Sequence, residues 1–195
     1  MKPYQNPFLY TKNDMTEIII ETERLKFISI TPTFIHHLFN TKSKEEIKTF
    51  FDFDDQGFEK YQEMHEKGME TYQLSFLFFL LVEKQSNLPI GECGFHTWNK
   101  KHNRAELFYF LKADEHKRKG FMTEAIPVIL RYGFEQMDLH RVEALIAAWN
   151  EPSLKLVNKF NFVKEGVMRE DYFENGRHED STCYSLLVSE YKSSL

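Results

Sequence analysis

The chain has 195 residues, of which 42% are hydrophobic and 28% charged, and its formal net charge is −5 at pH 7. This length and composition predict one globular domain with a sizeable core and exclude a disordered chain. The negative charge argues against a general nucleic-acid binder, and the longest apolar run, 76–82, is too short to span a bilayer.

The start of the sequence and the two cysteines predict the compartment. Residues 1–16 lack the apolar core of a signal peptide and contain two prolines, so we expect an N-terminal arm before a domain at 17–195. Cys93 and Cys183 are too few for a disulfide framework. We therefore expect a cytoplasmic protein with free thiols, both buried as small hydrophobic side chains.

The first part of the domain is expected to contain one strand and then three helices. Alternation and β-branched residues predict a strand over 17–30. Thr31 before Pro32 is typical of a helix start, and Ser43 with Glu46 has the spacing of a capping box. A third, amphipathic helix is predicted over 58–72.

A meander of strands follows, and then helices and strands alternate. The meander is antiparallel because its connections are short, and its strands are predicted at 74–83, 89–98 and 104–112. The next helix is predicted from Phe121 to Met137, with a kink or an irregular start caused by Pro127. The remaining predicted elements are a strand at 141–149, a helix at 152–160 and strands at 162–170 and 181–190. This order predicts a mixed α/β class.

The stretch EHKRKGFMTEA, residues 115–125, is the first candidate for a binding site. The first N–H groups of a helix lack internal partners and carry partial positive charge. Gly120 permits a tight turn there, and three basic residues precede it, so the stretch predicts a pyrophosphate site. The other interpretation is a solvated lead-in to a helix, which Asp114 and Glu115 favour. No GxxxxGK[ST] motif and no GxGxxG after a strand is present.

Several stretches together resemble the GNAT superfamily of acyl-CoA-dependent N-acetyltransferases, over about residues 17–190. ETERLKFISI resembles the opening strand, RAELFYFLKADEHKRKGFMTEA the fourth strand and acetyl-CoA loop, and NEPSLKLVNKFNFVKEG the Asn-x-x-Ser helix with the strand after it. ENGRHEDSTCYSLL is similar to the closing strand of the branch of ribosomal-protein N-terminal acetyltransferases. The resemblance implies a mostly antiparallel twisted sheet of about six to seven strands, a splay between the fourth and fifth strands, and helices on both faces.

The resemblance implies acetyl-CoA as co-substrate and no metal. The implied binding residues are Phe110, Leu111 and Lys112 for the acetyl group and pantetheine, Lys117, Arg118, Lys119, Gly120, Phe121, Met122 and Thr123 for the pyrophosphate, and Asn150 with Ser153 for the pantetheine end. Two positions depart from the usual loop pattern, since lysine stands at 117 and methionine at 122. The backbone N–H of Met122 remains available to a phosphate.

Three side chains are the candidates for catalysis by the same resemblance. Glu106 corresponds to a carboxylate that activates the amine through water in some members, and Ser153 would protonate the departing thiolate. Tyr172 stands where related ribosomal-protein enzymes have a glutamate, so it would act as an acid instead. Each has a structural alternative that stays open: a solvent-facing strand residue, a serine in a helix's first turn and a packing aromatic.

The implied reaction is direct attack of a primary amine on the thioester, because neither cysteine falls in the acetyl-CoA motif. The expected acceptor is a small amine or a protein N-terminus. We expect no nucleic-acid or membrane partner, and a homodimer is compatible with the sequence. His96 and Trp98 are candidates to line the acceptor pocket. A CoA-binding sensor without catalysis and a nucleotide-binding module are the alternatives.

Residues 52–63 nearly match a calcium loop, but Gln56 is a weak ligand and no second loop is present.

Overall fold

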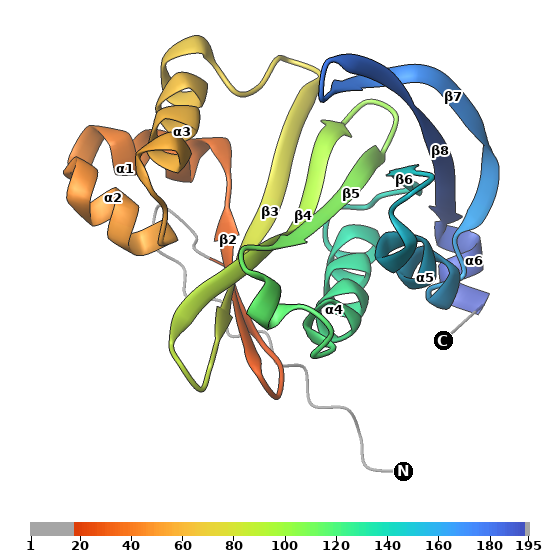
Figure 1. The fold of residues 1–195 in the computed structure, drawn as a ribbon, viewed down its shortest axis with the longest axis horizontal. Helices are drawn as coiled ribbons and strands as arrows, with labels where there is room; N and C mark the ends of the chain where they lie inside the picture. Colours follow the sequence, from red (N-terminus) through yellow and green to blue (C-terminus); the bar gives the residue numbers. More distant parts are fainter. Residues whose placement is uncertain (1–17, 194–195) are drawn as a thin grey trace.

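Eight strands lie in the order β1-β2-β3-β4-β5-β6-β8-β7 in the computed structural model, which describes residues 18–193 (Figure 1). The strands are β1 (Ile19–Glu21), β2 (Leu25–Ile30), β3 (Leu74–Glu83), β4 (Leu88–Asn99), β5 (Arg104–Leu111), β6 (Arg141–Ala147), β7 (Val163–Glu174) and β8 (Arg177–Leu187). All neighbours are antiparallel except β5 and β6. The predicted mixed α/β fold is confirmed, whereas the predicted arm lies outside the described residues.

Helices cover both faces of the sheet. They are α1 (Pro32–Thr41), α2 (Lys44–Phe51), α3 (Asp55–Lys67), α4 (Phe121–Glu135), α5 (Glu151–Lys159) and α6 (Val188–Ser193), with a 3₁₀ turn η1 at Asp114–His116. Figure 1 shows α1, α2 and α3 together on one side and α4, α5 and α6 on the other. α4 is one continuous helix through the exposed Pro127.

Alternate residues of β3 supply the two cores that these helices cover. Leu77, Phe79 and Leu81 belong to the core shared with α4, whereas Phe78 and Leu80 belong to the core shared with α1, α2 and α3. Side chains of a strand point alternately to opposite faces. The apolar run of β3 is therefore continuous because this strand is buried on both sides.

The predicted helix starts are confirmed where a cap was recognised in the sequence. The Thr31 side chain accepts the Phe34 N–H, and Ser43 and Glu46 form the complete capping box. α3 begins earlier than the predicted 58, because the Asp54 side chain caps it by accepting the Gly57 N–H at 2.9 Å. The helix ends at Lys67, before the predicted end at 72.

Two hairpins correct the predicted strands. The expected strand at 17–30 is split by a turn in which the Thr22 N–H donates to the Leu25 carbonyl, and this adds the eighth strand. At the other end, β7 and β8 extend to a turn at Asn175 and Gly176, both with positive φ. Asn-Gly favours such a hairpin turn. Residues 188–190, predicted as strand, belong to α6.

β5 and β6 separate after three paired positions. Their last paired residues are Glu106 and Glu143, although β5 runs on to Leu111 and β6 to Ala147. β5 stays paired with β4 as far as Leu111, so the separation opens only toward β6. This opening, called the splay below, confirms the predicted separation of neighbouring strands. The extra N-terminal strand makes them the fifth and sixth.

Candidate functional site

The loop after β5 presents backbone N–H groups at the N-terminus of α4. Gly120 is the N-cap residue, with φ 81°, and no side chain caps the helix there. Arg118 also has a positive φ of 62°. Residues 117–120 are exposed, whereas the side chains of Phe121 and Met122 are buried in the core. The loop therefore leaves an uncapped helix start and three basic side chains open to an anion.

A contact with the β1–β2 turn holds this loop. The Arg24 guanidinium donates from Nη1 to the Lys119 carbonyl at 2.9 Å and from Nε to Glu124 at 2.6 Å. Thr22 Oγ also donates to Glu124, at 2.5 Å, and the guanidinium lies 4.7 Å from the centre of the Phe121 ring. Burial opposes ionisation of Glu124, but the hydrogen bonds from Thr22 and Arg24 lower its pKa overall.

Lys112, the residue after β5, is held through both its backbone and its side chain. The Lys112 N–H donates to the Ile90 carbonyl at 3.0 Å, so the sheet already uses it. The Lys112 ammonium donates to the carbonyls of Phe51 and Asp52 at the end of α2. Phe110 is 44% exposed. Lys112 therefore ties the end of β5 to the end of α2.

Asn150 and Ser153 form the N-terminal cap of α5. Asn150 Oδ1 accepts the Ser153 N–H at 3.2 Å, and the Asn150 N–H donates to the carbonyl of Ala147, the last residue of β6. The cap is therefore the Asn150 side chain, and Ser153 takes part in it through its backbone N–H. It also places the first turn of α5 just beyond the end of β6, at the open end of the splay.

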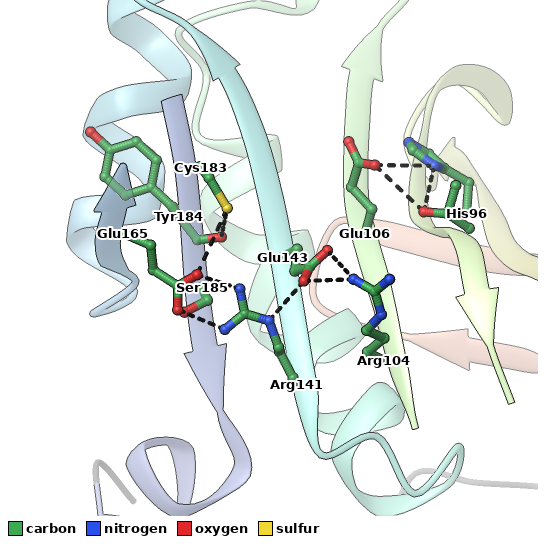
Figure 2. Close-up of polar contacts among 10 residues, drawn as sticks. His96, Arg104, Glu106, Arg141, Glu143, Glu165, Cys183, Tyr184 and Ser185 are labelled. Carbon is green, nitrogen blue, oxygen red and sulfur yellow. Dashed lines mark hydrogen bonds and ion pairs between the residues drawn. The ribbon is translucent and has the colours of Figure 1, made fainter. Parts of the chain in front are cut away.

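Glu106 is the carboxylate at the point where the splay opens. Figure 2 shows it directed toward His96, whose Nδ1 lies 3.7 Å from Glu106 Oε2. Thr97 Oγ lies 3.5 Å from the same carboxylate, on a strand irregularity where Thr97 has φ 47°. Burial raises the pKa of Glu106 to about 7, with the charges of Glu143 and Asp171 acting in the same direction and Thr97 opposing them.

The neighbouring carboxylates have cationic partners. Glu143 lies 3.0 Å from Arg104 and 2.7 Å from Arg141, and Arg141 also binds Glu165 at 2.5 Å (Figure 2). The Arg141 and Ser185 hydrogen bonds lower the pKa of Glu165 to about 2. Within residues 18–193, no Lys or Arg forms an ion pair with Glu106. Burial lowers the pKa of His96, so its imidazole is neutral at pH 7.

Tyr172 lies on β7, opposite Glu179 of β8. Its hydroxyl is buried and has no hydrogen-bond partner among the described residues. Asp171, the residue before Tyr172 on β7, carries a charge that raises the pKa of Glu106. The prediction of two buried cysteines is half wrong: Cys93 is buried, but Cys183 is only partly buried, with its Sγ 3.9 Å from Glu165.

Sequence reasoning missed several residues of this region. They are Arg24, Tyr109, Glu124, Glu143 and Asp171. The alternation of Arg104 with Glu106, and of Arg141 with Glu143, was the available signal for a charged strand face. The contacts of Arg24 and the burial of the Tyr109 hydroxyl had no local signal.

Residues 18–193 contain neither a metal-ligand cluster nor a membrane-spanning helix. In residues 18–193, no group of three or more His, Cys, Asp or Glu side chains is arranged to hold a metal ion. The stretch at 52–63 forms the end of α2 and most of α3. No helix in that described range is long and apolar enough to cross a membrane.

Comparison with known proteins agrees with this geometry. The model of the acetyltransferase (GNAT) domain matches residues 24–163. The uncharacterized N-acetyltransferase YoaA of Bacillus subtilis (strain 168) is 32% identical over 171 residues, which cover 87% of this chain and 96% of that protein. The putative ribosomal N-acetyltransferase YdaF of the same organism is 33% identical over 102 residues, covering 52% of this chain and 55% of that protein.

A solved structure has the same fold. The spermidine N-acetyltransferase from Vibrio cholerae, in complex with CoA and spermine, superposes with a TM-score of 0.65 at 26% identity, covering 88% of this chain and 99% of that chain. The uncapped start of α4 is suited to an anion, and the splay leaves the end of β5 open on the side of β6. The chain belongs to the GNAT acetyltransferase family and is an acetyl-CoA-dependent N-acetyltransferase.

Proposed function

We propose that this protein transfers the acetyl group of acetyl-CoA to a cationic primary amine by direct attack of the amine on the thioester. The observation that carries the proposal is the place of Glu106. It is the last residue of β5 paired with β6, and within residues 18–193 no Lys or Arg pairs with it. A carboxylate that no Lys or Arg neutralises is suited to receive a substrate ammonium.

Glu106 is the general base in this proposal. An amine reaches the site protonated and must lose a proton before its nitrogen can attack. With a pKa of about 7, Glu106 is ionised in a large fraction of molecules at neutral pH and is still basic enough to accept that proton. The side chain is 19% exposed, which leaves a path for the proton to water.

The α4 loop holds the donor in this proposal. The N–H groups at Gly120, Phe121 and Met122 bind the pyrophosphate, and the side chains of Lys117 and Arg118 add attraction. Lys117 is 2.6 Å from Asp114, an exposed pair that a phosphate would compete with. The splay gives the pantetheine arm access to the β6-facing side of β5.

Direct attack is supported by the state of the two thiols. Burial raises the pKa of Cys93, which is therefore a thiol and a poor nucleophile at neutral pH. Burial and the Glu165 charge raise the pKa of Cys183 as well. Neither cysteine is suited to carry the acetyl group, and a sensor without catalysis has no support from relatives named as N-acetyltransferases.

The class of acceptor follows from the charge around Glu106. Glu143 and Asp171 both act on its pKa, so the region favours a cation over a neutral or acidic ligand. Polyamines and protein N-termini both carry an ammonium group. The names of the relatives include spermidine and ribosomal acetyltransferases, so both belong in the first trials.

The test is an acceptor panel with acetyl-CoA as donor. Spermidine, spermine, peptides with free N-terminal alanine or serine, and their N-blocked forms are incubated with the protein, and release of the CoA thiol is followed. The acetylated product is identified by mass spectrometry. Transfer to a free amine, lost in its blocked form, supports the proposal. Acetyl-CoA binding without transfer to any of these amines contradicts it.

A further inference from the structure

Tyr109 lies on the face of β5 opposite Glu106. Phe108, two residues after Glu106, packs against the core shared with α1, α2 and α3, whereas Tyr109 packs against the core shared with α4. In β4 its pairing partner is Cys93, which is fully buried. Tyr109 is three residues beyond the last contact of β5 with β6, so it lies within the splay. The proposed donor loop and the start of α5 are on this same side.

The hydroxyl of Tyr109 is buried and has no hydrogen-bond partner among residues 18–193. A buried phenol hydroxyl usually finds a partner, so its isolation calls for an explanation. Ser153, in the first turn of α5, is the polar side chain that acts on this hydroxyl. Burial raises the pKa of Tyr109, while the Ser153 side chain acts in the opposite direction.

We propose that the Tyr109 hydroxyl donates the proton to the departing sulfur of CoA, with Ser153 as the positioning residue that orients it. This inference rests on the proposed function and changes one part of it, because the resemblance assigns proton donation to Ser153 itself. Glu106 and Tyr109 would then serve the two ends of the reaction from opposite faces of one strand.

The chemistry balances with these two residues. The ammonium first gives one proton to Glu106, which releases it to water. The amine nitrogen then bonds to the thioester carbon and its second proton passes to Glu106, while the C–S bond breaks and the electron pair stays on sulfur. The Tyr109 O–H proton moves to that sulfur, and tyrosinate regains a proton from water. A phenol, with an ordinary pKa of about 10, is matched to a thiol of about 8.5, whereas a serine hydroxyl is a much weaker acid.

An equilibrium measurement tests the contact without any acceptor amine. Binding of CoA and of desulfo-CoA, which lacks the sulfur, is compared at pH 9, where part of the free CoA thiol is ionised. A hydrogen bond from Tyr109 to the thiolate should make wild type prefer CoA by roughly 10-fold. Tyr109→Phe should lose that preference while binding desulfo-CoA like wild type. Tyr184→Phe removes the hydroxyl of a buried tyrosine in β8; it is the control and should keep the preference for CoA.

Kinetics give the second readout. Tyr109→Phe should lower kcat by about 10²- to 10³-fold with the KM for acetyl-CoA within 3-fold, and Ser153→Ala should lower kcat less. If Tyr109→Phe keeps both the preference for CoA and a kcat within 3-fold of wild type, the role is wrong. If it does not fold, 3,5-difluorotyrosine at position 109 takes its place. Its more acidic phenol should move the alkaline limb of kcat to lower pH, and an unmoved limb overturns the role.

Failure of the proposed function looks different. Wild type would then bind CoA without acetylating any amine of the panel, and the comparison of CoA with desulfo-CoA would still decide whether Tyr109 contacts the sulfur.

Discussion

Arg24 and Glu124 bind each other across 100 residues of sequence. The guanidinium Nε lies 2.6 Å from Glu124 Oε2, and the Arg24 backbone N–H donates to Oε1 at 3.0 Å. The same guanidinium donates to the Lys119 carbonyl, one residue before the glycine that starts α4. A hairpin at the start of the domain therefore fixes the geometry of the proposed pyrophosphate loop.

Arg24→Ala should weaken CoA binding by roughly 10-fold, because one hydrogen bond to the loop and one ion pair to α4 are lost together. The dissociation constant is measured by isothermal titration calorimetry. Lys84→Ala removes an exposed ion pair with Glu21, 2.8 Å long, at the same hairpin and serves as the control. Equal dissociation constants for wild type and Arg24→Ala would show that the loop holds its shape without the clamp.

Gly120→Val should reduce CoA affinity far more than Lys119→Ala. The φ of 81° at Gly120 is unfavourable for a β-branched residue by about 1–2 kcal/mol, so the loop must change shape to relieve it. Lys119→Ala removes only one exposed charge, and we expect an effect below about 3-fold. Thermal shift with CoA measures both. If both variants bind like wild type, the stretch is only a charged lead-in to the helix.

Glu106→Gln should lower kcat/KM by about 10²- to 10⁴-fold, and it should abolish the rise of kcat/KM with pH. In wild type the base works when ionised, so kcat/KM should rise with pH and level off above a pKa of about 7. The measurement is an initial-rate profile from pH 5.5 to 9 with the best acceptor of the panel. Glu135→Gln, at the exposed end of α4, is the control variant. If kcat/KM of Glu106→Gln still rises with pH around pH 7, the general base is another group.

The same carboxyl should also affect stability. Its pKa is about 7 in the folded chain and 4.5 in its ordinary state, so between these values the folded state holds more protons. The contribution of this carboxyl to the free energy of unfolding is therefore fully present below pH 4.5, and it is lost as pH rises through 7. Glu106→Gln should be the more stable protein at pH 8, by roughly 1–2 kcal/mol since partial exposure screens the effect, and gain nothing at pH 4.

Urea unfolding at the two pH values measures this difference, and Glu135→Gln again provides the reference. An equal gain at both pH values would mean that Glu106→Gln acts through packing and not through the carboxyl charge.

Signals that act over a few residues were enough to predict much of the fold. The caps at Thr31 and at Ser43 with Glu46 were found because a side chain and the N–H it binds are three residues apart. The strand β3 was predicted as well, but its burial on both faces was found only in the structure. The hairpin at Asn175 and Gly176 carried an equally local signal that was overlooked.

By itself, then, the sequence determined the class of fold, the place of the loop before α4 and the candidacy of Glu106, because each depends on neighbouring residues or on the order of elements. Only the tertiary structure decided that Glu106 stands where β5 leaves β6, that its pKa is near 7, and that Arg24 clamps the loop. It also decided that the Tyr109 hydroxyl is buried without a partner in the described chain. These properties depend on burial and on charges brought together from distant parts of the chain, which no local pattern records.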